Sequence, residues 1–272
     1  MAENSFDRIA PYDGRGSIKA MSMSQQSNFA TASTGKKQLV SLAAALVFSG
    51  IALDTTAQLT VNETASNATM ISQLEGNAIN IIDATFTING SAHDRQVCHF
   101  TNIPSAELPL PNGVLITTGY GSEAVGPNNT TSRSTDVPGN GTTNDPDLMM
   151  IEPLATNDVV IIEFDFIPKL DTLQISFVWA SEEYCEYTCS EYNDAFAFLV
   201  SGPGLSGPYS NSAENFAILP NGTDVEINNV HNGNCNGWYS PCNPTNAAYY
   251  YNNTGGTYLQ ADGLTIGLKA QG

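Results

Sequence analysis

The segment Ser181-Glu-Glu-Tyr-Cys-Glu-Tyr-Thr-Cys-Ser-Glu-Tyr-Asn-Asp194 lies between two apolar runs, and this arrangement decides the fold. In the run before it, residues 173–180, every second side chain is a large apolar or aromatic one. The same alternation continues after it, through residues 195–200. Alternation at period two, bounded by turn residues, is typical of half-buried strands. The sequence therefore predicts an acidic loop held between two core strands, and such loops often carry function.

Short apolar runs separated by Gly, Pro, Asn and Asp clusters continue along the chain, and we expect them to form strands. Because no alternating helical pattern appears, the sequence predicts an all-β fold of the β-sandwich or jelly-roll kind. One short N-terminal helix is expected at Thr69–Glu75, with Asn67 as its cap and Gly76 as its stop. The predicted strands are Ile81–Thr87, Val114–Thr117, Val159–Ile167, Thr172–Ala180, Ala195–Ser201, Asn215–Leu219, Asp224–Asn228, Ala248–Tyr251 and Leu264–Lys269.

Residues 1–58 are predicted to be a signal peptide or N-terminal membrane leader, followed by one β-domain at 59–272. The first 38 residues hold five of the nine basic residues, and the uncharged run Leu39–Leu53 follows them. A basic region, a short apolar core and small residues at Thr55 and Ala57 are typical of a secretory signal, here cleaved after Ala57. The alternative is a membrane-spanning signal anchor, but the run is shorter than the ~20 residues that a spanning helix needs. We therefore expect an exported protein that meets a membrane only through this leader.

The chain is strongly acidic, with 27 Asp and Glu against nine Lys and Arg, a formal charge of −18. Removing residues 1–58 takes away four acids and five bases, which leaves −19. Such a surface repels nucleic acid and anionic membranes, whose binding requires a basic patch. It suits divalent cations or basic partners, and the alternative is that the acidity serves only solubility.

Five cysteines in an exported chain indicate disulfides. The local spacing favours the pairs Cys185–Cys189 and Cys235–Cys242, each closing a short loop. Cys98 is left over, either as a buried thiol or with its partner in a segment beyond this sequence. A four-cysteine zinc site is the alternative, although zinc sites usually have two residues between paired ligands.

Several motifs together resemble a known family. The segment SEEY-x-EY is followed by YND-x-F-x-F and SGPG, and this order is similar to the choice-of-anchor L domain, a module of exported bacterial surface proteins. The resemblance covers roughly Thr69 to Ala270 and implies surface location without catalytic residues. Family members have a proline where this chain has Cys185, and they continue into further strands, so a truncated domain is expected. The collinear motifs are Gly113–Gly119, Asp145–Leu148, Glu163–Pro168, Asn215–Pro220, Val225–Asn229 and Asp262–Thr265.

The acidic loop is the strongest candidate for a metal site. Carboxylate and amide oxygens, completed by backbone carbonyls, are the ligands that calcium prefers over transition metals. Clustered carboxylates repel one another, and a bound cation relieves that repulsion. The alternatives are a solvated acidic turn, or an Asn-Asp pair that only caps the turn of the next strand. The candidate calcium ligands are Glu182, Glu183, Asn193 and Asp194, joined by Asp145 and Asp147 if the polar loop Tyr120–Asp145 folds back.

The loop His231–Asn246 carries two cysteines together with Trp238 and Tyr239. Aromatic rings on a stiffened polar loop stack on sugar faces, so these two residues are candidate ligand-binding residues. The alternative is that they form a small hydrophobic plug for their own loop.

These observations predict an exported, non-catalytic module for adhesion or recognition, with a glycan, matrix or surface-protein ligand and no nucleic acid. The alternative from another class is an extracellular polysaccharide hydrolase using Glu163 and Asp165, or the pair Glu182 and Glu183. A purely structural spacer within a surface protein is a third possibility.

Overall fold

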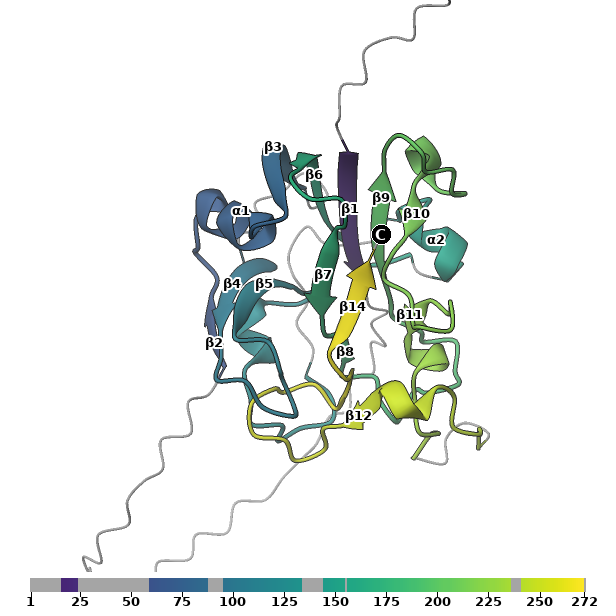
Figure 1. The fold of residues 1–272 in the computed structure, drawn as a ribbon. Helices are drawn as coiled ribbons and strands as arrows, with labels where there is room; N and C mark the ends of the chain where they lie inside the picture. Colours follow the sequence, from purple (N-terminus) through teal and green to yellow (C-terminus); the bar gives the residue numbers. More distant parts are fainter. Residues whose placement is uncertain are drawn as a thin grey trace, which may run out of the picture.

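A computed structural model describes residues 16–23, 59–87, 95–133, 144–154, 156–235 and 241–271 (Figure 1). The prediction of an all-β fold is confirmed: strands in four sheets dominate, with short helices between them. The strands do not merge into two continuous sheets, so the sandwich or jelly-roll arrangement stays a prediction.

The largest sheet has the order β10-β9-β1-β6-β3, and β11 also pairs with β9. Its strand β6 shows why these sequences form strands. Val160, Ile162, Phe164 and Phe166 are buried, while Glu163 and Asp165 between them are exposed, as period-two alternation requires. The bounds are β1 Gly16–Met23, β3 Ile79–Thr87, β6 Val160–Pro168, β9 Ala195–Ser201, β10 Glu214–Asn215 and β11 Val225–Glu226.

The strand β1 lies in the middle of this sheet, although its residues fall within the predicted leader. It pairs antiparallel with β6 on one side, from Gly16 opposite Phe166, and with β9 on the other, from Ser17 opposite Ser201. Cleavage after Ala57 would therefore remove a central strand. The apolar run Leu39–Leu53 and the cleavage position lie outside the described residues.

Three smaller sheets complete the β-structure. The first has the order β2-β4-β5, the second β12-β13-β8, and the third pairs β14 with β7. The strands β2 and β4 were not predicted, because they are short and sit in mixed polar sequence. The bounds are β2 Thr60–Asn62, β4 Val97–Thr101, β5 Asn112–Ile116, β7 Gln174–Phe177, β8 Ala180–Ser181, β12 Tyr250–Asn252, β13 Gly263–Thr265 and β14 Leu268–Gln271.

The predicted N-terminal helix is present as α1, Asn67–Glu75, and ends before Gly76. Its cap is Ser66 rather than Asn67, because the Ser66 hydroxyl accepts a hydrogen bond from the backbone N–H of Thr69. A second short helix, α2 at Leu148–Ile151, was not predicted. The 3-10 turns are η1 Gly121–Ala124, η2 Ser210–Ser212, η3 Ile227–Asn229 and η4 Ala247–Tyr249. No helix among the residues listed above is long and apolar enough to cross a bilayer.

The main core lies on one face of the largest sheet. Aromatic rings dominate it: Phe177 packs at 5.5 Å from Phe196 and at 6.0 Å from Phe198, measured between ring centroids. These rings come from the two runs that flank the acidic loop. Burial of both runs therefore fixes where the loop begins and ends.

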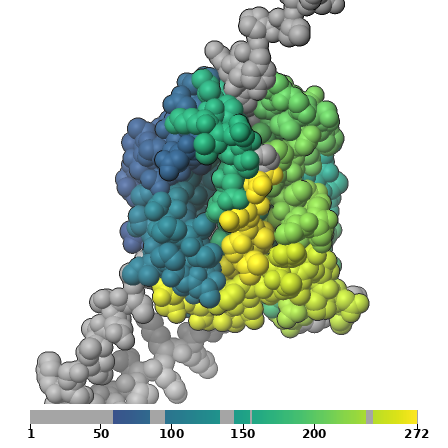
Figure 2. Space-filling view, viewed as in Figure 1, coloured from purple at the N-terminus to yellow at the C-terminus, as the bar shows by residue number. Residues whose placement is uncertain are grey.

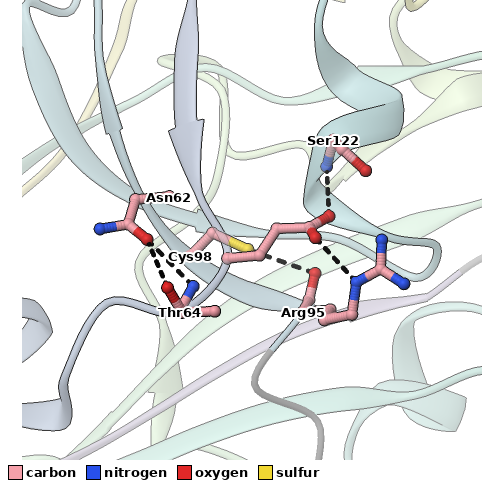
Figure 3. A network of polar contacts seen from close by, with 6 residues as sticks. Asn62, Thr64, Arg95, Cys98 and Ser122 are labelled. Carbon is pink, nitrogen blue, oxygen red and sulfur yellow. Dashed lines mark hydrogen bonds and ion pairs between the residues drawn. The ribbon is translucent and has the colours of Figure 1, made fainter.

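A polar network ties the small β2-β4-β5 sheet to the turn η1 (Figure 3). One carboxylate oxygen of Glu63 accepts from Arg95 Nε at 2.7 Å, and the other accepts from the backbone N–H of Ser122 at 2.7 Å. Cys98 is buried and forms no disulfide with another cysteine of this sequence, and its thiol donates a hydrogen bond to the Arg95 carbonyl. Through its bond to Ser122, Glu63 holds η1 in place, and the polar segment that follows η1 leads to the candidate site.

Candidate functional site

The acidic loop is closed at its base by direct contacts between its two ends. The Ser181 hydroxyl, at the end of β8, donates to Asp194 Oδ2 at 2.6 Å. The same hydroxyl oxygen accepts from the backbone N–H of Glu183 at 3.0 Å. Because Asp194 is 7% exposed and precedes β9, the loop is held between core strands as the sequence predicted.

The four predicted cysteines do form two disulfides, but the predicted pairing was wrong. Cys185 is bonded to Cys235 and Cys189 to Cys242. Each bond joins the acidic loop to the 231–246 loop instead of closing a short loop within either one. The physical reason is tertiary: the two loops lie against each other, as the hydrogen bond from Cys235 N to the Cys185 carbonyl shows. Spacing along the chain carries no information about that contact.

The most unusual feature of the site is a pair of acids, Glu182 and Asp262, that two distant segments of the chain bring close together. The strand β8 pairs antiparallel with β13, with Ser181 opposite Gly263 and Ala180 opposite Leu264. Glu182 follows Ser181 and Asp262 precedes Gly263, each just outside its strand, and the charge of Asp262 helps to raise the pKa of Glu182. Like charges that lie close together in a fold disfavour their own ionised forms. The sequence conceals this juxtaposition, because 80 positions separate the two acids.

Three oxygen atoms in this region are buried without a hydrogen-bond partner among the described residues: Glu182 Oε2, Gln260 Oε1 and Asp262 Oδ2. Gln260 is 1% exposed and Asp262 is 3% exposed. The Gln260 side chain also lies within hydrogen-bonding reach of Glu182. Buried polar atoms are nearly always paired, so these three acceptor oxygens mark a region that can take a hydrogen-bond donor or a cation.

The electrostatics agree with this geometry. Burial, followed by the charge of Asp262, raises the pKa of Glu182 to about 8. Burial, followed by the charges of Asp194 and Glu182, raises the pKa of Glu183 to about 9. Burial also raises the pKa of Asp262 to about 6. Carboxyls with pKa values of about 8 and 9 hold their protons at pH 7, so Glu182 and Glu183 take their charged forms only at higher pH or beside a cation.

Residues 128–130 of the polar segment after Tyr120 contact this site, although none of them was predicted to belong to it. Asn128 donates to Asp262 Oδ1 at 2.7 Å, and the Gln260 amide donates to the Thr130 carbonyl. Glu107 holds the opposite side, since its Oε1 accepts from the backbone N–H groups of Tyr258 and Leu259 at 2.7 Å each. These contacts fix the backbone that carries Gln260 and Asp262.

The other predicted ligands are placed in different contacts. Asn193 is buried, accepts from the backbone N–H of Asn228 and donates to Glu152. Asp145 caps the start of α2 by accepting from the backbone N–H groups of Asp147 and Leu148. Asp147 Oδ1 accepts from the N–H and the hydroxyl of Ser210. The structure thus brings together Glu182, Glu183 and Asp194, and it places Asn193, Asp145 and Asp147 beside α2, η2 and η3. Trp238 and Tyr239 lie outside the described residues.

Sulfur-containing clusters also come together. Among the described residues, Cys189, His231 and Cys242 place their ligand atoms within 4.8 Å of one another, and so do Cys185, Glu186 and Cys235. Zinc binds the thiolate form of cysteine, and each cluster contains a disulfide that has no thiolate to offer. The zinc alternative would therefore require reduction of both bonds.

A family model described as the Choice-of-anchor L domain matches residues 55–272. The chain belongs to the choice-of-anchor L domain family. No curated protein matches the chain, and no solved structure does. Choice-of-anchor domains are modules of exported surface proteins, and the two disulfides of this one fit an extracellular location.

Within this choice-of-anchor L domain, sequence reasoning missed Gln260 and Asp262 as site residues. Asp262 appeared only as part of a family motif, and Gln260 did not appear. The signal that could have identified them is the presence of two polar residues, Gln260 and Asp262, within the buried segment 259–265. A buried segment that contains an acid and an amide indicates a polar partner inside the fold.

Proposed function

We propose that this domain is a non-catalytic recognition module of a surface protein and that calcium holds its acidic loop in place. In this proposal Glu182, Asp262 and Gln260 supply the protein ligands, with Glu183 and Asp194 adding negative charge nearby. Calcium takes six to eight oxygen ligands in flexible geometry, and carboxylate and amide oxygens suit it. The ion would neutralise the like-charge pair and would accept the three unpartnered oxygen lone pairs.

The observation that carries the proposal is the closeness of two acids, Asp262 and Glu182, which lie just outside the paired residues of β13 and β8 and whose charges act on each other. Both carboxylates have an oxygen that is buried and without a hydrogen-bond partner. Such a pair costs stability unless a proton or a cation is shared between the two acids. At extracellular millimolar calcium, even a weak site of this kind would be filled.

Rigid display is the role that follows. The strands fix the ends of the acidic loop, two disulfides fix it to the 231–246 loop, and the ion fixes its first residues. Preorganised loops bind partners with less loss of conformational entropy. A glycan, a matrix component or another surface protein is the proposed ligand class, and the net charge of −18 argues against nucleic acid.

The test is thermal unfolding of the oxidised full-length chain in EDTA and then in millimolar calcium. A ligand that binds only the folded state stabilises it by RT ln(1 + [L]/Kd), so the midpoint should rise by several degrees. The rise should disappear in Glu182→Gln and in Asp262→Asn. The matched control is Glu191→Gln, an exposed acid of the same loop, which should keep the rise. An equal rise in all three variants would contradict the proposal.

One observation favours a second candidate function, hydrolysis of polysaccharide. Glu182 and Glu183 line a cleft and have raised pKa values, and a general acid in a glycosidase has the same property. Glu183→Gln separates the two functions. A recognition module keeps ligand binding after this change, whereas an enzyme loses turnover of a soluble polysaccharide.

A further inference from the structure

A large cleft lies beside the acidic loop, between the small β2-β4-β5 sheet and β7. Its volume is about 560 Å³, within the range of ~300–1,000 Å³ that is typical of ligand-binding sites. Figure 2 shows the hollow between the blue surface of the β4 and β5 region and the green surface of β7. Core side chains of the largest sheet, including Ile162, Phe164 and Phe198, form its floor.

Two strand edges border this cleft. All residues of β5 and all residues of β7 line it. Among the described residues, β5 pairs only with β4, and β7 pairs only with β14. Each strand therefore has one edge with no strand partner among the described residues. Exposed edges of this kind are templates for the addition of a strand.

The side chains at these edges are apolar and only half-buried. Val114 and Ile116 of β5, and Ile175 of β7, are partly exposed while packing against the main core. A soluble domain normally covers or charges such an edge. An occupant with alternating apolar residues would bury these side chains and pair with the backbone beside them, which is the mode known as β-augmentation.

The charge of the cleft specifies the occupant further. The charged residues that line it are Glu75, Glu123, Arg133, Glu182, Glu183 and Asp194. Arg133 is ion-paired with Glu123 at 2.8 Å and also lies near Glu182. Three of the other acids, Glu182, Glu183 and Asp194, lie at the end next to the acidic loop, where a cation would favour their charged forms. Charge complementarity favours a cationic occupant whose basic side chain reaches that end.

We propose that the cleft binds an extended peptide strand of another protein, with alternating apolar side chains and a lysine or arginine near one end. The strand adds to the free edge of β5 or β7, its apolar side chains cover the floor, and its cation meets Glu183 and Asp194. This site goes beyond the calcium proposal, because the edges and the floor do not depend on a bound ion. The fold already accepts one strand distant in sequence, since β1 inserts between β6 and β9.

The probe is a fluorescein-labelled, nine-residue peptide of alternating valine and threonine with lysine at one end, titrated with oxidised full-length protein and followed by anisotropy. Saturable binding is expected, in EDTA as well as in calcium. Replacing the lysine by glutamate should weaken binding at least tenfold at low salt. N-methylation of alternate backbone nitrogens should abolish binding, because it removes the donors of the added strand without touching the protein.

Two protein variants complete the test. Ile116→Glu places a charge on the apolar wall and should abolish binding, while Ile82→Glu, at an exposed site on β3, should leave it unchanged. Equal affinity for the N-methylated peptide would overturn the strand geometry, and so would the absence of saturation at millimolar protein. If the protein forms concentration-dependent dimers that exclude the peptide, the cleft belongs to a second copy of the chain. If a fatty acid displaces the peptide, and the affinity of the peptide does not depend on its lysine, the cleft binds a small apolar ligand. Either of these results would also overturn the proposal.

Discussion

Removal of the disulfide Cys189–Cys242 is the perturbation whose magnitude follows most directly from the structure. Alone, this bond closes a loop of 53 residues, and loop-closure entropy assigns it about 4 kcal/mol. With Cys185–Cys235 intact, however, the same bond closes only the short path through residues 185–189 and 235–242. For a loop of about 11 residues the stabilisation falls to about 3 kcal/mol.

The double variant Cys189→Ser/Cys242→Ser should therefore lose about 3 kcal/mol of unfolding free energy, measured by urea titration. Loss of both bonds should cost about 7 kcal/mol, which is comparable with the total stability of many domains. Thiol titration of the denatured double variant gives a second measurement. Crossed pairing leaves one reactive thiol, that of Cys98. Three thiols would show that Cys185 and Cys235 had lost their partners, and the local pairing would then be right.

Three further predictions concern the acid pair, its supporting glycine and the central strand. In EDTA, the wild type should lose stability relative to Glu182→Gln as the pH rises from 5 to 9. The reason is that a buried carboxyl with a raised pKa is tolerated in the folded state only while it is protonated. If the difference in unfolding free energy between the wild type and Glu182→Gln does not change with pH, the burial of Glu182 is contradicted. Gly263→Ala should cost roughly 1–3 kcal/mol in urea, because a Cβ there would meet the Tyr184 ring at 2.6 Å; an unchanged midpoint would show that the ring yields freely. A chain that begins at residue 59 lacks β1 and should melt at a lower temperature, and a peptide of residues 16–23 added in trans should reverse this loss. Equal melting of both chains would show that β1 adds nothing.

The sequence was sufficient to predict the bounds of strands whose own pattern of apolar and polar residues is dense. The strand β9 has the predicted bounds, and β6 differs from its prediction by one residue at each end, because dense period-two patterns specify which face is buried. It was insufficient for β1, whose residues also fit the basic region of a leader and whose pairing depends on strands more than 130 positions away. Local sequence carries no record of such long-range pairing.

The same difference between local pattern and long-range pairing applies to the candidate site. The acidic loop, and the grouping of Glu182, Glu183 and Asp194 near one another, followed from composition and position. The neighbouring acid Asp262 did not, because the pairing of β8 with β13 brings its segment beside Glu182, and such pairing is a property of the folded sheet. Asn193 and Asp145 are the same chemical types as calcium ligands, yet they bond to the backbone N–H groups of Asn228 and Leu148. Residue type alone does not separate a ligand from a cap.

Crystals of the oxidised full-length protein grown in calcium, and measured at a wavelength where calcium scatters anomalously, test the central claim most directly. The account predicts one strong anomalous peak at the β8–β13 junction, about 2.3–2.6 Å from oxygens of Glu182, Gln260 and Asp262. It also predicts that this peak is absent from crystals of Asp262→Asn. A peak at Asp145 and Asp147 instead, or no peak in a well-ordered acidic loop, would contradict it.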